Sequence, residues 1–137
     1  MKIFEIEPGL FQSTKIDDPN QLSIVGIEVV IDLEGGFDNE DIAFYLHQYV
    51  YWHILDLPFL PNREDLWRVA RFGYDAWKFG KRVLVHCTMG RNRSGLINGC
   101  ILWLNGMTGE DAVRLIQEKR PGALSNPVFA SYLKTLT

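Results

Sequence analysis

Apolar residues of this chain gather first into short continuous runs that predict strands. Residues 27–33 are apolar apart from Glu28 and Asp32, which is typical of a strand buried on both faces. Residues 50–57 are rich in aromatic and β-branched side chains and also predict a strand, as does the run over 81–86. Near the N-terminus a Pro-Gly pair interrupts the apolar residues and predicts one or two shorter strands, which contain Ile3, Phe4, Ile6, Leu10 and Phe11.

Apolar residues with helical spacing fill most of the remaining chain. Start signals accompany them: Pro19 follows two aspartates, Asn62 precedes a turn whose third residue is acidic, and Asn126 precedes a proline. The run from Ser94 onward is apolar around almost its whole circumference, which predicts a central helix. The predicted helices cover residues 19–25, 39–48, 63–79, 94–104 and 111–119, and a last one begins at residue 127.

Strands that alternate with helices predict an α/β fold with a central, mainly parallel sheet flanked by helices. A chain of 137 residues has the length of one domain, so we expect residues 1–137 to form a single domain. Ligands of such sheets bind beyond the carboxyl ends of the strands. The segment after the strand at 81–86 is therefore the first candidate for a functional site.

Composition and charge exclude several classes of protein. The formal net charge of −3 argues against a nucleic-acid coat protein, whose binding face would be strongly basic. The two cysteines, Cys87 and Cys100, are too few for a disulfide framework and lack the spacing of metal ligands. The N-terminus lacks the apolar core of a signal peptide, and no apolar run approaches the roughly 20 residues that span a bilayer. We expect a soluble, cytoplasmic protein that uses no metal or cofactor.

The most informative segment runs from His86 to Ser94 and reads HCTMGRNRS. A short glycine-containing loop between a strand and a helix points its backbone N–H groups and the helix N-terminus at one concavity, which favours an anion. A cysteine at the start of that loop is stabilised there as a thiolate. Arg93, at its end, carries a planar set of donors that grips two phosphate oxygens at once. The segment predicts a nucleophile and an anion clamp in one site, with a phosphate held by Thr88, Met89, Gly90, Arg91, Asn92 and Arg93.

This segment resembles the signature of the cysteine-dependent phosphatases, in which five residues separate a cysteine from an arginine. Gly90, three residues after Cys87, and Ser94, directly after Arg93, are similar to the dual-specificity branch of that family. The resemblance covers most of the chain and is weaker in the N-terminal half. Its other parts are residues 108–119, Arg120-Pro121-Gly122, residues 126–133, Gly9-Leu10 and residues 26–33. It implies a protein-tyrosine-phosphatase-like fold.

The resemblance also implies a two-step reaction with named residues. Cys87 attacks phosphorus and carries the phosphoryl group until water removes it, while Arg93 and the loop amides stabilise the equatorial oxygens. Ser94 donates a hydrogen bond to the thiolate that departs in the second step. The leaving oxygen needs a proton, and Asp56, at the end of a predicted strand, occupies the family's position for this acid. Asp65 is the alternative acid, but its place in a first helical turn already gives it a capping position.

Four neighbouring residues have roles that the sequence specifies less closely than that of Cys87, and two of them keep two interpretations. Arg91 either faces solvent and adds positive potential at the mouth of the site or contacts the substrate. His86 is expected to support the loop by hydrogen bonding and to help keep the thiolate charged, whereas Asn92 is expected to bond backbone amides and shape the loop. Cys100 could pair with Cys87 as a resolving thiol, but the helix carries it about 9 Å along the axis from Ser94, so we expect it in the core.

The functional hypotheses differ mainly in the substrate. The first is a phosphatase of phosphorylated proteins that accepts phosphotyrosine and phosphoserine or phosphothreonine, because so short a chain has little room for the loop that deepens the pocket of strict tyrosine phosphatases. The second keeps the chemistry but acts on a phosphoinositide, a phosphorylated glucan, an RNA 5′ phosphate or another small phosphomonoester. The third is a catalytically dead phosphate-binding module, which the presence of Cys87, Arg93 and Asp56 disfavours. For the first two we expect inhibition by oxyanions that mimic phosphate.

Overall fold

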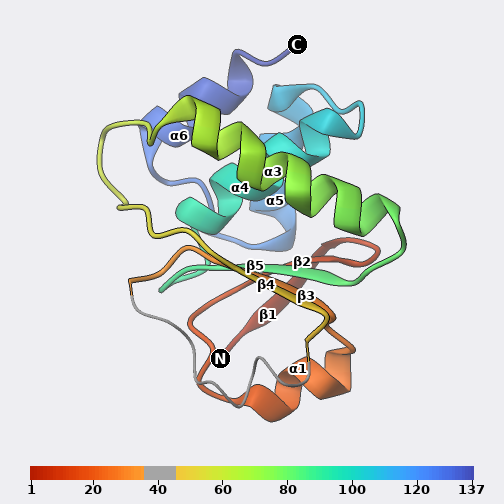
Figure 1. Ribbon diagram of the computed structural model, residues 1–137. Helices are drawn as coiled ribbons and strands as arrows, with labels where there is room; N and C mark the ends of the chain where they lie inside the picture. The colour runs from red at the N-terminus through yellow and green to blue at the C-terminus, as the bar shows by residue number, and fades with distance from the viewer. Residues whose placement is uncertain (36–45) are drawn as a thin grey trace.

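The computed structural model describes residues 1–35 and 46–137. It shows a five-stranded sheet with helices on both faces (Figure 1). The strands are β1 Ile3–Glu7, β2 Leu10–Ser13, β3 Val29–Asp32, β4 Gln48–Tyr51 and β5 Val83–His86. Their order across the sheet is β1-β2-β5-β3-β4. All neighbours pair in parallel except β1, which is antiparallel to β2. The alternating strands and helices thus form the mainly parallel α/β layer that the sequence predicts.

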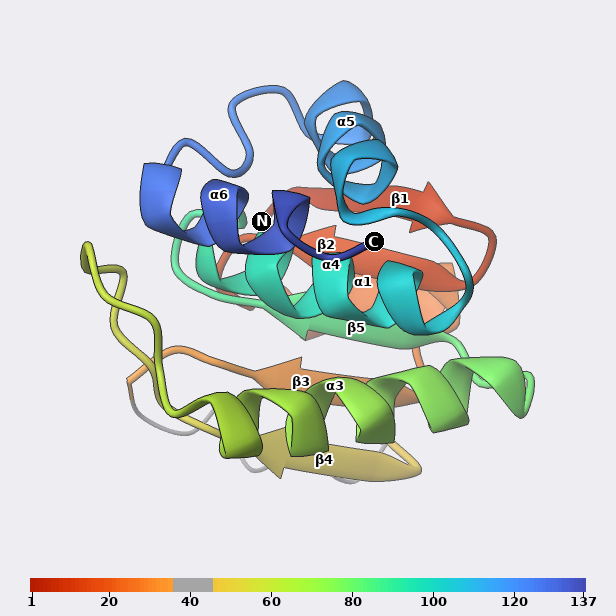
Figure 2. The same ribbon diagram turned by 90° about the horizontal axis from the view of Figure 1, so that it is seen from above.

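Helices cover the two faces of the sheet unequally. The described helices are α1 Pro19–Val25, α3 Arg63–Lys78, α4 Arg93–Leu104, α5 Gly109–Lys119 and α6 Pro127–Lys134. The last four lie on one side of the sheet and α1 lies on the other (Figures 1 and 2). Caps set several of their starts: the Asn62 side chain accepts from the Asp65 N–H at 3.0 Å, and the Thr108 side chain accepts from the Asp111 N–H at 3.2 Å. None of the described helices combines the length and the apolar character needed to cross a bilayer.

Helix α4 occupies the centre of the larger layer. Nine of its 12 residues, 94–102, are buried, as expected for a helix that is apolar around almost its whole circumference. It packs against α3, α5 and α6 as well as against β2 and β5. Because β5 enters the loop at Cys87 and α4 leaves it at Arg93, a fully buried strand and a largely buried helix hold the two ends of that loop.

Two predicted elements differ from the structure. The strand predicted over 50–57 is wrong in position, since β4 ends at Tyr51. Its partner strand β3 ends at Asp32, the register partner of Tyr51, so later residues have no strand to pair with. Beyond Tyr51, the Trp52 N–H still donates to the carbonyl of Asp32, and the Ile54 N–H donates to the carbonyl of Leu33. The helix predicted over 39–48 falls largely on residues 36–45, outside the described part of the chain, but Gln48 begins β4 rather than ending a helix.

Candidate active site

The candidate site lies at the edge of the sheet where the carboxyl ends of the parallel strands meet. Ser13, Asp32 and Tyr51 end their strands in register with His86, the last residue of β5. Residues 87–92 follow directly and form the loop that leads into α4. The strand–loop–helix geometry predicted for this segment is therefore confirmed, at the edge where parallel sheets bind their ligands.

The backbone of this loop is turned so that its carbonyl groups face outward. Four consecutive carbonyl oxygens accept a hydrogen bond from a donor outside the loop. The pairs are Lys15 N–H to Thr88 at 3.1 Å, Arg120 Nη2 to Met89 at 3.0 Å, Gln12 Nε2 to Gly90 at 3.0 Å and Leu124 N–H to Arg91 at 3.0 Å. In a trans peptide the N–H points opposite to the carbonyl, so the N–H groups of residues 89–92 point inward.

These inward N–H groups are free to bind an anion. Within the described part of the chain, none of the N–H groups of residues 88–93 donates to a protein acceptor. Several N–H groups turned toward one concavity, next to the N-terminus of α4, form a site that favours negative charge.

Gly90 is the one loop position where a side chain is excluded on two grounds. Its φ of 65° lies in the left-handed region, which glycine adopts without strain. A Cβ here would also lie 2.7 Å from the carbonyl carbon of Ser13 and 2.8 Å from the nitrogen of Thr14. Those are backbone atoms at the end of β2, so the clash could be relieved only by moving the strand or the loop.

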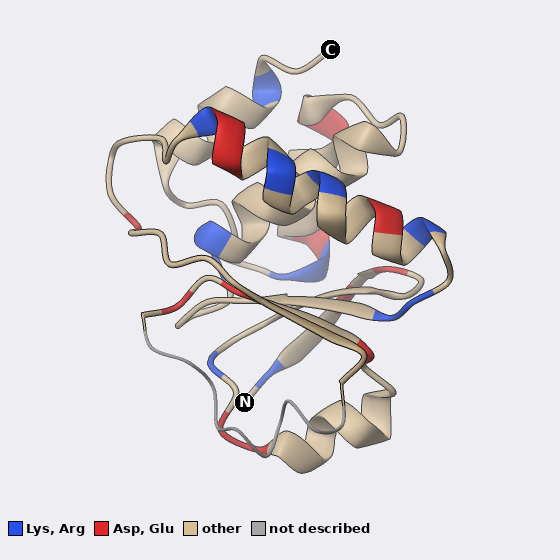
Figure 3. Cartoon of the chain, viewed as in Figure 1, with Lys and Arg blue, Asp and Glu red and all other residues tan. Residues whose placement is uncertain are grey.

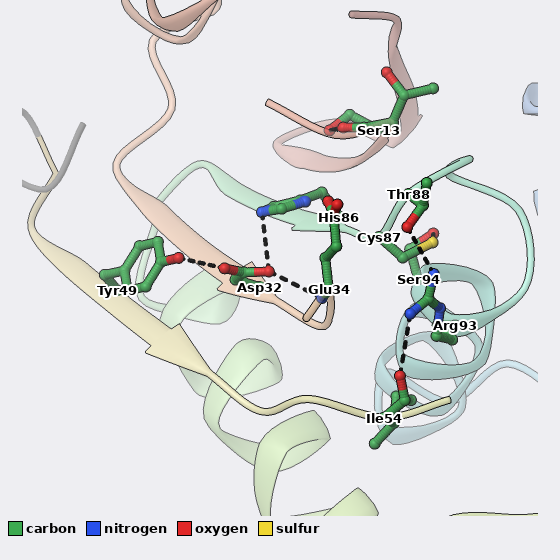
Figure 4. Close-up of polar contacts among 11 residues, drawn as sticks. Ser13, Asp32, Glu34, Tyr49, Ile54, His86, Cys87, Thr88, Arg93 and Ser94 are labelled. Carbon is green, nitrogen blue, oxygen red and sulfur yellow. Dashed lines mark hydrogen bonds and ion pairs between the residues drawn. The ribbon is translucent and has the colours of Figure 1, made fainter. Parts of the chain in front are cut away.

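Cys87 and Ser94 lie together in this loop. Cys87 is 2% exposed, and its Sγ is 3.3 Å from the Oγ of Ser94, which is fully buried (Figure 4). Cys87 lines a cavity of about 140 Å³, whose other lining residues are Asp56, Met89, Arg91, Asn92, Arg93 and Ser125. A larger cavity of about 410 Å³ is lined by residues between 52 and 62, and none of its walls comes from the loop. The small cavity therefore joins three of the four residues predicted to be catalytic, and the fourth contacts Sγ.

The guanidinium of Arg93 is held from two sides. Its Nη1 donates to the carbonyl of Ile54 at 3.1 Å, and its Nη2 donates to Oγ1 of Thr88 at 2.9 Å (Figure 4). A guanidinium fixed in this way needs little reordering to bind two oxygens of a tetrahedral anion. The bond to Ile54 also ties α4 to the segment that carries Asp56.

Asp56 lies in the irregular segment after β4, not at a strand end as predicted. Its carboxylate accepts from two amide side chains, Asn92 Nδ2 at 2.9 Å and Asn126 Nδ2 at 2.8 Å. Asn92 Oδ1 in turn accepts from the backbone N–H of Asn126 at 2.9 Å. Asn92 thus bonds a backbone amide, as expected, but one in the segment before α6. It connects the loop, the Asp56 segment and the start of α6.

His86 is anchored to β3 behind the loop. Its Nε2 lies 3.4 Å from Oδ1 of Asp32, and both side chains are fully buried. Asp32 also accepts from the backbone N–H of Glu34 at 2.9 Å and from the hydroxyl of Tyr49 (Figure 4). The residue that precedes Cys87 is therefore held by the centre of the sheet.

Positive charge gathers at the mouth of the cavity although the chain is acidic overall. Arg91 Nε and Arg120 Nη1 lie 3.8 and 3.9 Å from the position that a Cβ on Gly122 would take, so the two side chains are neighbours. Burial and then the charge of Arg91 lower the pKa of Arg120, whereas the charge of Cys87 raises it. Figure 3 shows a basic segment at the start of α4, where Arg93 is the first residue. This local cluster attracts anions that the net charge of −3 would repel.

The alternative acid, Asp65, and the candidate resolving thiol, Cys100, lie outside the cavity. Asp65 is in the first turn of α3, where its N–H bonds the Asn62 cap, and it does not line the cavity. Cys100 is fully buried in the core, as expected, and burial raises the pKa of its thiol. Among the described residues, no group of histidine, cysteine or acidic side chains could hold a metal ion.

Sequence reasoning did not assign several polar side chains that support the site. Arg120 and Gln12 hold loop carbonyls, Asn98 bonds Gln12, and Asp32 bonds His86. A signal was present for three of them, because Gln12, Asn98 and Asp32 interrupt otherwise apolar strands or helices. A polar residue at a buried position needs a hydrogen-bond partner, but the sequence does not show which one.

Comparisons with known proteins agree on one family. Residues 10–137 match the model of the dual specificity phosphatase catalytic domain. The chain is 28% identical over 118 residues to a probable rhodanese domain-containing dual specificity protein phosphatase of Dictyostelium discoideum, and 28% identical over 142 residues to human dual specificity protein phosphatase 12. The matches cover 84% and 97% of this chain but only 24% and 41% of those proteins.

Solved structures show the same architecture. A mouse putative dual specificity phosphatase, complexed with zinc tungstate, superposes with a TM-score of 0.84 at 20% identity, covering 97% of this chain and 84% of the other. Human DUSP28 superposes with a TM-score of 0.84 at 20% identity, covering 97% and 90%. At this level of identity the likeness concerns the fold.

Proposed function

The chain belongs to the dual-specificity phosphatase family, and we propose that it hydrolyses phosphomonoesters through a cysteinyl-phosphate intermediate. The observation that carries the proposal is the small cavity, where Cys87, Arg93 and Asp56 meet beside the free N–H groups of residues 88–93. A nucleophile, an oxyanion clamp and a proton donor in one cavity are the complete set of roles that this reaction needs.

In the first step the thiolate of Cys87 attacks phosphorus in line. An S–P bond forms, and the P–O bond to the leaving group breaks. Asp56 gives its proton to the departing oxygen. The equatorial oxygens are bound by Arg93 and the loop N–H groups, which are oriented before the substrate arrives. The amide contacts from Asn92 and Asn126 keep the Asp56 carboxyl at the cavity.

In the second step water releases the phosphate. Asp56, now a carboxylate, takes a proton from the water whose oxygen attacks phosphorus, and the S–P bond breaks. The electron pair returns to Cys87, and Ser94, 3.3 Å from Sγ, donates a hydrogen bond to the departing thiolate. The enzyme returns to its starting state with inorganic phosphate as the second product.

As substrate we propose a phosphorylated protein, with phosphotyrosine and phosphoserine or phosphothreonine both accepted. Asp56 and Arg91, two residues that line the cavity, are exposed, so the phosphate lies within reach of a short side chain. The complex of the mouse relative with zinc tungstate supports the expectation that this chain binds oxyanions that resemble phosphate. Side-by-side assays of phosphopeptides of all three types, a phosphoinositide, a phosphorylated glucan and a 5′-triphosphorylated RNA test this choice, and a preference for a non-protein substrate would overturn it.

The nucleophile is tested with Cys87→Ser. We expect this variant to lose hydrolysis of a small aryl phosphate while tungstate still raises its melting temperature, because the anion contacts come from the loop backbone and Arg93. Turnover that survives the substitution would refute the assignment of Cys87.

The acid is tested with Asp56→Ala, and Asp65→Ala is the matched control. Asp56→Ala should slow turnover of alkyl phosphates far more than that of activated aryl phosphates, whose leaving groups hardly need a proton. The same leaving-group dependence in Asp65→Ala instead would show that the acid is misassigned.

A further inference from the structure

Two buried amide side chains lie where apolar packing would be expected, between β2 and α4. Gln12 and Asn98 are both fully buried. Leu10, which shares a face of β2 with Gln12, belongs to the core cluster that includes the buried residues of α4 on either side of Asn98. Burying an amide is unfavourable unless its hydrogen bonds are made, so this pair requires an explanation.

The hydrogen bonds of the pair run in one direction, toward the loop. Asn98 Nδ2 donates to Oε1 of Gln12 at 3.0 Å and also to the carbonyl of Phe11 at 3.3 Å. Gln12 Nε2 then donates to the carbonyl of Gly90 at 3.0 Å. Because Asn98 holds Oε1, the Gln12 amide is oriented with its NH₂ group toward the loop.

The bond to Gly90 determines where one N–H of the loop points. In the trans peptide between Gly90 and Arg91, the N–H of Arg91 is directed opposite to the Gly90 carbonyl. Gln12 holds that carbonyl on the β2 side, so the N–H of Arg91 faces the cavity that contains Cys87. Gly90 has no Cβ and a positive φ, so it is a point of the loop where the peptide could otherwise rotate.

Stability alone gives no reason for this arrangement. Asn98 Oδ1 is buried and accepts no hydrogen bond from the described residues, so the pair is incompletely satisfied. Replacing both members of a buried polar pair by apolar groups of similar shape is often neutral or stabilising. The pair is therefore better explained by what it does to the loop than by what it adds to the core.

We propose that Gln12 is a positioning residue for the phosphate-binding loop, and that Asn98 acts through it by fixing the orientation of its amide. The inference rests on the proposed function and adds a contact behind the loop that the reaction itself does not touch. Gln12 keeps the N–H of Arg91 aimed at the equatorial oxygens, which is a preorganised donor of the kind that oxyanion sites use.

The first test is Gln12→Met, which keeps the length of the side chain and removes the donor. We expect the dissociation constant of tungstate to rise, and kcat/KM for an aryl phosphate to fall, each by about tenfold, because one oriented donor to the oxyanion is lost. Val29→Ala is the control for general loosening, since Val29 is fully buried at the opposite end of the parallel strands. It should lower the melting temperature and leave tungstate affinity unchanged.

The second test asks whether Asn98 works through Gln12. Asn98→Leu alone should weaken tungstate binding, because the Gln12 amide loses the donor that fixes its orientation and can rotate away from the Gly90 carbonyl. In the Gln12→Met background the same substitution should have no further effect on tungstate affinity. The double variant buries no amide at these two positions and should fold at least as stably as the parent, which keeps the test valid if a single variant unfolds.

The outcomes separate this inference from the proposed function. If folded Gln12→Met bound tungstate within twofold of the wild-type affinity, the positioning role would be overturned. Additive effects of the two substitutions on tungstate affinity would overturn it as well. Neither result would affect the proposed function, provided that the wild-type protein hydrolyses phosphomonoesters. A wild-type protein that neither hydrolyses aryl phosphates nor binds tungstate would instead remove the proposed function.

Discussion

Asn126 is the residue whose substitution best separates stability from the placement of Asp56. Its Oδ1 caps α6 by accepting from the N–H groups of Val128 and Phe129 at 3.0 and 3.4 Å. Its Nδ2 donates to Oδ1 of Asp56 at 2.8 Å and to the carbonyl of Leu57 at 2.9 Å. One side chain thus starts a helix and holds the proposed acid. Asn126→Ser removes the second task and keeps the first, because serine caps helices as well as asparagine does.

The magnitudes follow from these contacts. Asn126→Ser loses one hydrogen bond to a carboxylate and one to a carbonyl, and since Asp56 is exposed, water replaces part of both. We expect the free energy of unfolding to fall by about 1–2 kcal/mol. Asn126→Ala loses the cap as well and should be destabilised by about 1 kcal/mol more.

The effect on catalysis should be the same for both variants. Asp56 loses one of its two amide contacts and keeps only Asn92, so the proton is less well placed. We expect kcat for an alkyl phosphate to fall about tenfold, the equivalent of roughly 1.4 kcal/mol. An activated aryl phosphate should react nearly as in the wild type.

Two measurements are made on each variant. Urea unfolding gives the change in unfolding free energy, provided that the m-value equals that of the wild type. Steady-state kinetics with a series of leaving groups gives the change in kcat. If kcat fell by the same factor for alkyl and for aryl phosphates, the reasoning would be refuted, because the loss would then not involve the acid. A rate loss in Asn126→Ala that serine restores would show that α6, rather than Asp56, is the cause.

Two further predictions concern the loop and the second cysteine. Gly90→Ala should lose more than about 2 kcal/mol of unfolding free energy and its stabilisation by tungstate, because left-handed strain is added to a backbone clash at 2.7 Å. Gly80→Ala, at φ 93° with no atom within 4 Å of its Cβ, carries the strain alone and is the control in the same urea titration. Cys100 should resist iodoacetamide at pH 8 in the folded protein, because burial raises the pKa of its thiol, and react only after denaturation, as peptide mass spectrometry would show. A labelled Cys100 in the native protein would contradict its burial.

The local patterns of the sequence determined much of the fold. The strands predicted over 27–33 and 81–86 contain β3 and β5, and the caps at Asn62 and Asn126 begin α3 and α6. These signals depend on periodicity and on capping side chains, which act over a few residues. The strand predicted over 50–57 failed because pairing is not local. Its aromatic and β-branched residues favour a strand, but β3 ends at Asp32 and leaves them no partner.

The loop was also predictable by itself, since a cysteine, a glycine and an arginine within seven residues of one strand–helix junction already specify an anion site. The side chains that hold the loop could not be predicted in this way. Gln12 and Arg120 bond its carbonyl groups, and Asn98 holds Gln12. Only the packing of β2, α4 and the end of α5 brings these three side chains to the loop. Asp56 was named from the family's position, but the two amides that hold it lie 36 and 70 residues away in sequence.

By itself, then, the sequence determined the elements, the nucleophile and the arginine of the candidate site, because helix periodicity and loop chemistry are properties of neighbouring residues. The tertiary structure decided which way the peptide groups of the loop point and which side chains hold them there. That orientation depends on donors distant in the chain, since each carbonyl is turned outward by a hydrogen bond from another part of the fold. An anion site made of backbone N–H groups has a composition that can be read from the sequence and a geometry that exists only after folding.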